Sequence, residues 1–255
     1  MLIWMFAVVG EFSQVFPEIF MSLQDVARND PLLDAMGIDP PMHSDGWGYV
    51  SLSGDDLVHY RTAVPVYDSN PVSAHSGFLI VHARKASPQE PHGVVNSHPF
   101  HASDQDMDIY LAHNGAFDKG GIAEILGISE IKGQTDSEIF LRLVISQTGR
   151  LTQRLESAIE ISADKKLLTG TPNLLAFGLE KETMEPELVY YTAPPNSGVY
   201  VDYNRLYLVR GRGWSGVFSS SITGSEFFPE DVEIDQVKTG RVFSLTERTK
   251  DQQNP

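Results

Sequence analysis

The sequence contains no cysteine, and this absence excludes several kinds of chemistry at once. Disulfide bonds, thiolate zinc sites and cysteine nucleophiles cannot be formed by these 255 residues. A disulfide-stabilised secreted protein is therefore not expected, and a cytoplasmic protein is the default. Basic residues are also scarce, with 19 Lys and Arg against 34 Asp and Glu and a formal net charge of -15. This balance disfavours nucleic acid and anionic membrane surfaces as partners.

Long apolar runs are missing too, since none reaches the ~18 residues that a membrane span requires. The N-terminal segment MLIWMFAVVG is apolar, but no basic residue precedes Arg28 and no small-residue cleavage site follows it. A signal peptide is therefore not expected. The length and the β-branched and aromatic content of Leu2 to Val9 predict a strand that is buried on both faces.

The rest of the chain reads as blocks of strands and blocks of helices. Strands are expected at residues 2–9, 46–53, 57–61, 77–84, 107–112, 173–179, 187–192, 206–209, 216–219 and 236–245. Helices are expected from Phe16 to near Asn29 and at residues 121–126, 136–147 and 152–163, with Gly149 as a C-cap and a loop over residues 30–44. This order predicts an α+β fold in which helices sandwich antiparallel sheets. We expect a single domain over residues 1–247 and a polar tail over residues 248–255.

The segment Asp108 to Phe117, DIYLAHNGAF, reads as a strand that runs into His113-Asn114-Gly115. Asn-Gly adopts positive φ easily, so a sharp turn should follow the strand. Such a turn can present a backbone N–H together with an amide side chain, which are the donors of an oxyanion hole. Considered alone, the segment is better explained as an ordinary Asn-Gly hairpin.

Four other short segments are rich in polar residues for their positions: HSDGWG (43–48), HARKAS (82–87), NSHPF (96–100) and TDSE (135–138). Arg84 directly follows an apolar strand, so its charge requires a carboxylate partner or an anionic ligand. Thr135 and Glu138 have the spacing of a capping box, and Asp136 would lie in the first turn of the following helix. A helix cap explains these residues without a function, yet an aspartate held there is also well placed to bind an ammonium group.

Metal and nucleotide sites find little support in the sequence. Five histidines (His82, His92, His98, His101 and His113) lie close together in the chain, but their spacings match no standard zinc pattern. Gly211 to Gly216 has the letters G-x-G-x-x-G but precedes a strand-like segment, so the dinucleotide context fails. No serine has the G-x-S-x-G context of a hydrolase nucleophile. We therefore expect neither a metal nor a cofactor.

Taken in order, HSDGWG, HARKAS, NSHPF, LAHNG, TDSE and Ser225-Glu226 resemble the class II glutamine amidotransferases, the N-terminal-nucleophile type. The likeness spans nearly the whole chain and is strongest to small stand-alone members, which include hydrolases of γ-glutamyl compounds. The resemblance implies a four-layer αββα sandwich. It also implies L-glutamine or a γ-glutamyl small molecule as ligand and, in some members, a partner synthase.

The resemblance assigns a role to each segment. Arg84 would bind the α-carboxylate of the substrate, and Asp136 would bind its α-ammonium group. The Asn114 amide and the Gly115 N–H would form the oxyanion hole.

Two further sets of residues would complete the pocket that the resemblance implies. Ser87 and His98 would line it. His43, Asp45 and Trp47 would support it from outside.

One departure from the family pattern changes the expected activity. The family's nucleophile is an N-terminal cysteine, and matching the opening strand places it at Ile3, followed by the family's arginine at Trp4. The first hydroxyl residue is Ser13, and cleavage before it would delete the buried strand. Two function classes remain. The protein either binds glutamine, a γ-glutamyl compound or a partner without hydrolysis, or it is an amide hydrolase whose nucleophile is missing only from this sequence.

Overall fold

Two antiparallel sheets form the centre of the molecule. The computed structural model describes residues 2–70, 72, 74, 76–87, 90–131, 134–194 and 201–246. The first sheet has the strand order β11-β9-β10-β1-β4-β2-β3, and the second has the order β12-β8-β7-β6-β5. The strands of the first sheet are β1 (Leu2–Gly10), β2 (Trp47–Ser53), β3 (Asp56–Thr62), β4 (Gly77–Lys85), β9 (Leu206–Gly211), β10 (Trp214–Ser219) and β11 (Glu233–Gln236). Those of the second are β5 (Phe100–Ser103), β6 (Met107–Asn114), β7 (Asn173–Glu180), β8 (Pro186–Thr192) and β12 (Val242–Ser244).

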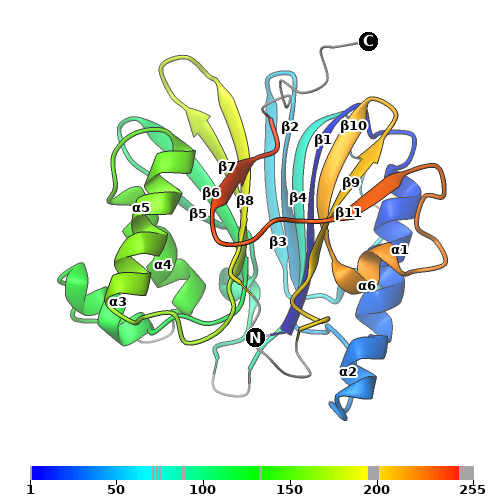
Figure 1. Cartoon of the computed structure of the whole chain (residues 1–255), viewed down its shortest axis with the longest axis horizontal. Helices are drawn as coiled ribbons and strands as arrows, with labels where there is room; N and C mark the ends of the chain where they lie inside the picture. The colour runs from blue at the N-terminus through cyan, green and yellow to red at the C-terminus, as the bar shows by residue number, and fades with distance from the viewer. Residues whose placement is uncertain are drawn as a thin grey trace.

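Helices cover the outer face of each sheet, so the predicted αββα sandwich is confirmed (Figure 1). The helices on the first sheet are α1 (Phe16–Arg28), α2 (Pro31–Ala35) and α6 (Ser220–Thr223). Those on the second sheet are α3 (Lys119–Ile125), α4 (Asp136–Ile145) and α5 (Leu151–Asp164). Short 3-10 turns occur at η1 (Val66–Asp68) and η2 (Val94–Asn96).

Side-chain alternation along β1 shows how the layers are held together. Trp4, Phe6 and Val8 belong to the apolar cluster shared with α1. Met5 and Ala7 belong to a second cluster, which fills the space between the two sheets. Because successive side chains of a strand point to opposite faces, one apolar strand contributes to both cores, as the unbroken run Leu2 to Val9 predicted.

The expected first helix is confirmed, and the reasons for its ends are visible. Pro17 lies in the first turn, where its missing N–H costs no hydrogen bond. The buried side chains of α1 recur at helical spacing and face the first sheet: Phe16, Ile19, Phe20, Leu23 and Val26. The helix ends at Arg28, directly before Asn29, Asp30 and Pro31.

Three details of the predicted fold are wrong. The expected loop over residues 30–44 contains α2, a single turn that Asp30 caps by accepting from the Leu32 N–H at 3.0 Å. The expected strand at residues 236–245 is two strands, β11 and β12, which lie in different sheets. Gly149 does not cap α4, because that helix ends at Ile145 with Ser146 as its C-cap. The strand β5 was not expected, and the proposed tail lies outside the described residues.

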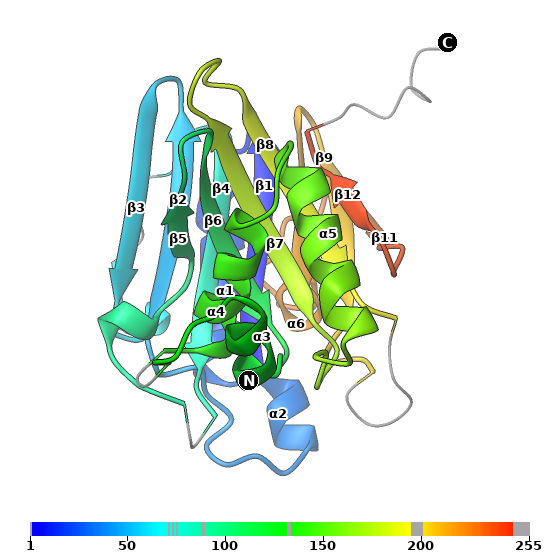
Figure 2. The ribbon, with the colours of Figure 1, turned by 90° about the vertical axis from the view of Figure 1, so that its left-hand side faces the viewer.

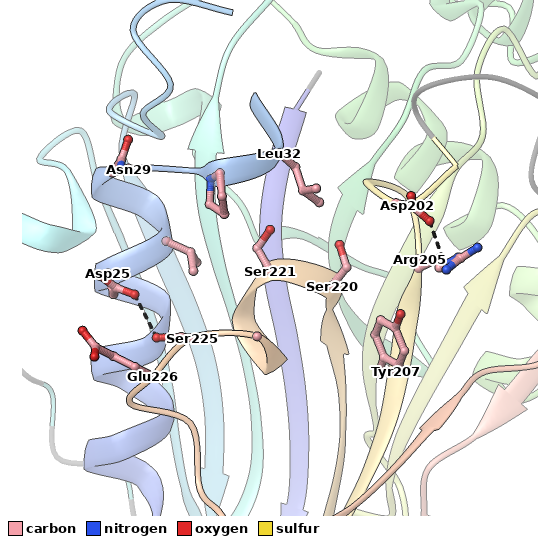
Figure 3. Close-up of a pocket in the computed structure, with 13 residues that line it drawn as sticks. Asp25, Asn29, Leu32, Asp202, Arg205, Tyr207, Ser220, Ser221, Ser225 and Glu226 are labelled. Atoms are coloured by element: carbon pink, nitrogen blue, oxygen red, sulfur yellow. Dashed lines mark hydrogen bonds and ion pairs between the residues drawn. The ribbon is translucent and has the colours of Figure 1, made fainter. Parts of the chain in front are cut away.

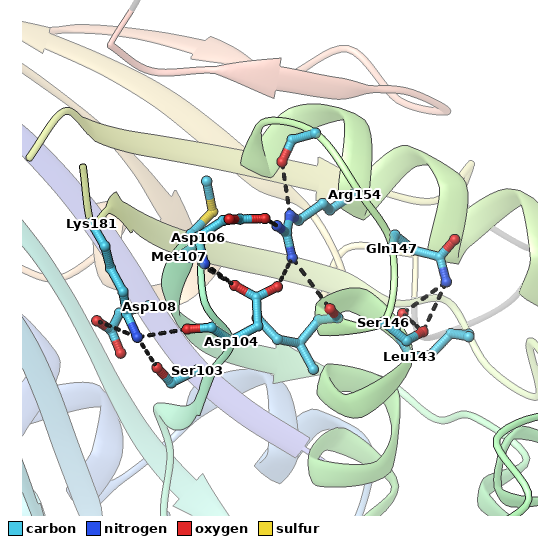
Figure 4. Close-up of polar contacts among 12 residues, drawn as sticks. Ser103, Asp104, Asp106, Met107, Asp108, Leu143, Ser146, Gln147, Arg154 and Lys181 are labelled. Atoms are coloured by element: carbon cyan, nitrogen blue, oxygen red, sulfur yellow. Dashed lines mark hydrogen bonds and ion pairs between the residues drawn. The ribbon is translucent and has the colours of Figure 1, made fainter. Parts of the chain in front are cut away.

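A buried arginine ties the second sheet to its helices (Figure 4). Arg154 of α5 donates to the Asp104 carboxylate, to the Gly149 carbonyl at 2.7 Å and to the Ile145 carbonyl at 3.2 Å. Asp104 in turn accepts from the Met107 N–H at 2.8 Å, in the turn between β5 and β6. The guanidinium therefore joins the β5–β6 hairpin to the junction between α4 and α5.

Candidate active site

Arg84 lies near the end of β4 and is fully buried. Its Nη2 donates to the Pro91 carbonyl at 3.0 Å, while Nε and Nη1 have no hydrogen-bond acceptor among the described residues. Burial lowers the pKa of this guanidinium, and the carboxylates of Asp45, Glu90 and Asp136 counteract the shift. A buried fork with two open N–H groups is suited to bind a carboxylate.

The backbone around Arg84 is held by the HSDGWG segment. Asp45 donates its N–H to the Arg84 carbonyl at 3.0 Å, and the Arg84 N–H donates to the Gly46 carbonyl at 2.9 Å. The Asp45 carboxylate also accepts from the Ala86 N–H at 2.7 Å. Asp45 therefore fixes both the strand end and the start of the loop beyond it. Ser87 follows in this loop and is partly exposed.

His43 and Trp47 have their close contacts on the α1 side of the first sheet, and their support of the pocket stays a prediction. The His43 Nε2 pairs with the Asp30 carboxylate at 3.0 Å, and both side chains are fully buried. The Trp47 ring packs against Phe20 of α1 at 5.5 Å between centroids. Both residues therefore belong to the α1 side of the first sheet.

Asp136 is the first residue of α4, as predicted. The Thr135 side chain caps this helix by accepting from the Glu138 N–H at 3.1 Å. The Asp136 carboxylate accepts two backbone N–H groups, from Ser137 at 2.9 Å and from Phe117 at 3.0 Å. The second of these bonds links Asp136 to the chain just after the Asn114-Gly115 turn. The side chain is thus anchored from two elements.

The Asn114-Gly115 turn is not a hairpin. Asn114 ends β6, is buried and lies opposite Asn173 in the neighbouring strand β7. After Gly115 the chain forms an isolated bridge between Phe117 and Leu168 and then enters α3. The hairpin interpretation is therefore wrong, because the strand that pairs with the Asn114 end of β6 is β7, which starts far along the chain at Asn173.

Only glycine fits at position 115. Its φ is +144°, and a Cβ atom there would lie 2.7 Å from Pro172 Cα and 2.9 Å from His113 Nε2. Both the backbone conformation and the close neighbours exclude a side chain. The turn is thus built so that the backbone passes very close to the adjacent loop.

Three buried histidines lie between Arg84 and this turn: His82, His98 and His113. The rings of His82 and His98 stack with centroids 4.0 Å apart, and His113 Nδ1 hydrogen-bonds to Ser137 Oγ at 2.8 Å. Burial holds the pKa of His82 and of His98 well below its usual value. Burial also lowers the pKa of His113 to about 4, although Asp136 opposes this shift. All three imidazoles are therefore neutral at pH 7.

His98 was expected in the site, whereas His82 and His113 were given no role in it. Their positions next to predicted site residues in the sequence could have indicated both histidines. His82 lies two residues before Arg84 and therefore faces the same side of β4. His113 directly precedes Asn114.

The backbone register places the expected position of the nucleophile next to Arg84. Ile3 of β1 lies directly opposite Arg84 of β4, and the pairing continues to Leu2 and Lys85. No spacing argument from the sequence could supply this neighbour. The residue at the place where the resemblance expects cysteine is thus an isoleucine, paired with Arg84 in the backbone register.

A cavity of about 740 Å³ lies on the other side of the first sheet (Figure 3). It is lined by residues of α1, α2, β9 and α6, with Ser220, Ser221 and Tyr207 in its wall. Arg205, the cation of its lining, pairs with Asp202 at 3.0 Å. The Ser225-Glu226 motif also lies here.

This cavity contains none of Arg84, His98, Asn114 and Asp136, and its own arginine, Arg205, is paired with Asp202. Arg84, His98, Asn114 and Asp136 are each buried, and their grouping into one binding site stays a prediction. In the part of the chain that the structure describes, no three His, Asp or Glu side chains are arranged to hold a metal ion. No helix of that part is long and apolar enough to cross a membrane.

Comparison with known proteins gives two kinds of similarity. The family model for glutamine amidotransferases class-II matches residues 33–169. Among solved structures, the allosteric regulatory enzyme of purine biosynthesis superposes with a TM-score of 0.67 at 16% identity over 94% of this chain. Glutamine phosphoribosylpyrophosphate amidotransferase from B. subtilis superposes with a TM-score of 0.64, also at 16% identity over 94% of this chain.

The chain spans 46% of the length of each of these two structures. A search of curated protein sequences gave no significant match. At such low identity the two structures establish the fold, which is that of the N-terminal-nucleophile hydrolases.

Proposed function

Because the chain belongs to the class II glutamine amidotransferases, we propose that it binds L-glutamine or a γ-glutamyl compound at Arg84 and Asp136 without hydrolysing it. The observation that carries this proposal is the buried Arg84 guanidinium, whose Nε and Nη1 have no acceptor among the described residues. Leaving such donors unpaired is costly unless a ligand accepts from them. The electrostatic influence of Asp136 on Arg84 indicates that the second charge is close.

The two charges match the two ends of an α-amino acid head group. Arg84 binds the α-carboxylate, and Asp136 binds the α-ammonium group with the carboxylate that Ser137 and Phe117 hold in place. The side-chain amide of Asn114 and the N–H of Gly115 bind the carbonyl of the γ-amide. Ser87 and His98 line the space around the ligand.

Hydrolysis is not expected, because the sequence contains no cysteine and Ile3 lies opposite Arg84. An isoleucine side chain has no nucleophilic atom and no proton to transfer. The protein is therefore proposed to be a pseudoenzyme that senses its ligand or works with a partner synthase. Its cytoplasmic location remains a prediction from the sequence.

Calorimetry with L-glutamine and a γ-glutamyl dipeptide tests the binding. We expect Arg84→Gln and Asp136→Asn each to weaken the affinity by about 10- to 100-fold, since each removes a charged hydrogen-bond partner. Arg205→Gln is the matched control, because this arginine lies in the separate cavity. N-acetyl-L-glutamine, which lacks the ammonium group, should bind the wild type weakly.

Two results would refute the binding proposal. One is the absence of heat with either ligand at millimolar concentration in a protein whose circular dichroism shows it folded. The other is an equal loss of affinity in Arg205→Gln.

The second candidate is an amide hydrolase whose nucleophile is missing only from this sequence. The Asn114-Gly115 turn is the observation that favours it. The wild type should release no glutamate from L-glutamine under the first proposal. A variant with cysteine at position 3, exposed as the first residue by cleavage of a leader, should gain hydrolysis if only the nucleophile is missing. Adding Asn114→Ala to it should then reduce the rate by about 10²- to 10³-fold. Glutamate release by the wild type would contradict the pseudoenzyme proposal.

A further inference from the structure

Strand β3 forms one edge of the first sheet. It pairs with β2 on one side and ends the strand order on the other. Figure 2 shows it as the outermost strand, with no element drawn beyond it. Edge strands present a row of backbone donors and acceptors that can pair with another strand, and proteins usually protect them with charge, proline or a covering loop.

Exposed apolar side chains gather around β3, although the strand also carries Asp56 and Arg61. Of the eleven exposed large hydrophobic side chains among the described residues, six lie on β3 or next to it. They form what we call the β3 patch: Leu57, Val58, Tyr60, Val64, Val94 and Val95. Arg61 of β3 donates to the carbonyls of Val95 at 3.1 Å and Ser97 at 3.2 Å, so the two segments are one continuous surface. Grouped apolar exposure of this kind marks an interaction site.

The β3 patch is also free of negative charge. Residues 57–64 and 94–95 include no Asp or Glu, in a chain with 34 of them and a net charge of -15. Two copies of so acidic a protein repel each other over most of their surfaces. At the β3 patch they can approach without bringing further carboxylates together, which favours self-association there.

We propose that the β3 patch binds a second copy of this chain by antiparallel pairing of the two β3 strands. A twofold axis perpendicular to the sheet keeps each face continuous, so residues on the same face of the two strands lie opposite each other. Centred on His59, this register places Val58 opposite Tyr60 of the second copy, an aliphatic–aromatic pair of the kind that stabilises sheets.

The same register places Leu57 opposite Arg61 of the second copy. Asp56, the first residue of β3, lies opposite Thr62 of the second copy and so faces no carboxylate, and Asp55 lies in the turn before the strand. The result is one sheet of fourteen strands across the dimer, twice the seven of each copy.

Sedimentation velocity and light scattering of the full chain test this proposal. The wild type should have about twice the monomer mass of 28.3 kDa at micromolar concentration. The double variant Val58→Glu and Tyr60→Glu should raise the dimer dissociation constant by at least about 100-fold, because like charges would face each other across the axis. Ile234→Glu is a closely matched control. Ile234 is 44% exposed against 43% for Val58, and it lies on β11, the opposite edge of the same sheet.

A dimeric wild type and Ile234→Glu together with a monomeric double variant would support the β3 interface. A wild type that stays monomeric at high micromolar concentration would overturn it, even if a different protein binds the patch. A dimer that survives in the double variant, or one that Ile234→Glu also dissociates, would overturn it as well. Circular dichroism of each variant must match the wild type, and these surface positions make that the expected result.

Discussion

Mild acid should destabilise this protein through its buried histidines. The pKa of His113 is about 4 in the folded protein, against its ordinary value of 6.5, because the ring is buried. Between these two values the unfolded chain binds a proton that the folded protein does not. Stability is therefore full above pH 6.5, falls as the pH drops towards 4, and changes no further through this residue below that value. His82 and His98 act in the same direction.

The size of the effect follows from the two pKa values. At pH 5 the unfolded state gains a factor of about 30 from protonation of this one imidazole, which is about 2 kcal/mol of lost stability. The full shift corresponds to about 3 kcal/mol. A typical domain has about 5–15 kcal/mol in total, so His113 alone can remove a substantial part of it.

Urea unfolding at pH 7.5 and pH 5 measures this loss. The variant His113→Asn keeps a polar group near Ser137 but cannot titrate, so its loss of stability on acidification should be smaller than that of the wild type by about 2 kcal/mol. Ser137→Ala is the control. It removes the same hydrogen bond and leaves the imidazole, so it should lower stability at both pH values and preserve the pH dependence. Equal acid sensitivity in the wild type and His113→Asn would refute the reasoning.

Two further substitutions test how the site and its sheet are held. Gly115→Ala should destabilise the fold by at least about 2 kcal/mol in urea unfolding, because the new Cβ meets Pro172. Gly54→Ala, also at positive φ but with open space around it, should cost less, and an equal cost would show that the contact is unimportant. Arg154→Met should lower stability by about 2 kcal/mol, since it removes a buried guanidinium that donates to the partly exposed Asp104 carboxylate and to the Gly149 and Ile145 carbonyls. A loss below about 1 kcal/mol, the level of a surface ion pair, would contradict the role of Arg154 as a tie between layers.

The layered fold could be predicted because its elements carry clear periodic signals. The apolar run of β1 and the helical spacing in α1 each specify both an element and its buried face. The strand β5 escaped prediction because four residues are too few for their alternation to stand out in the sequence. β11 and β12 were read as one strand because periodicity does not report the change of sheet between them.

The candidate site shows a sharper limit of sequence reasoning. Order and spacing of motifs predicted Arg84 and Asp136 as site residues, and Asp136 is one of three carboxylates that oppose the lowering of the Arg84 pKa by burial. The position of Ile3 opposite Arg84 is a consequence of sheet register, which depends on how distant strands pair. The histidines are neutral because they are buried on all sides. This burial depends on the packing of both sheets, which the sequence does not report.

The proposed loss of hydrolysis and the retention of a binding site are physically independent in this fold. Asp136 is held by N–H groups of Ser137 and Phe117, and Arg84 is held by its backbone bonds to Asp45 and Gly46. None of these bonds involves the residue opposite Arg84 on β1. Replacement of a nucleophile at that position would therefore remove the attack on the amide while leaving the two charges in place. On this reasoning, ligand binding should persist unchanged when Ile3 is replaced by valine, whereas Asp45→Ala should weaken it by loosening Arg84.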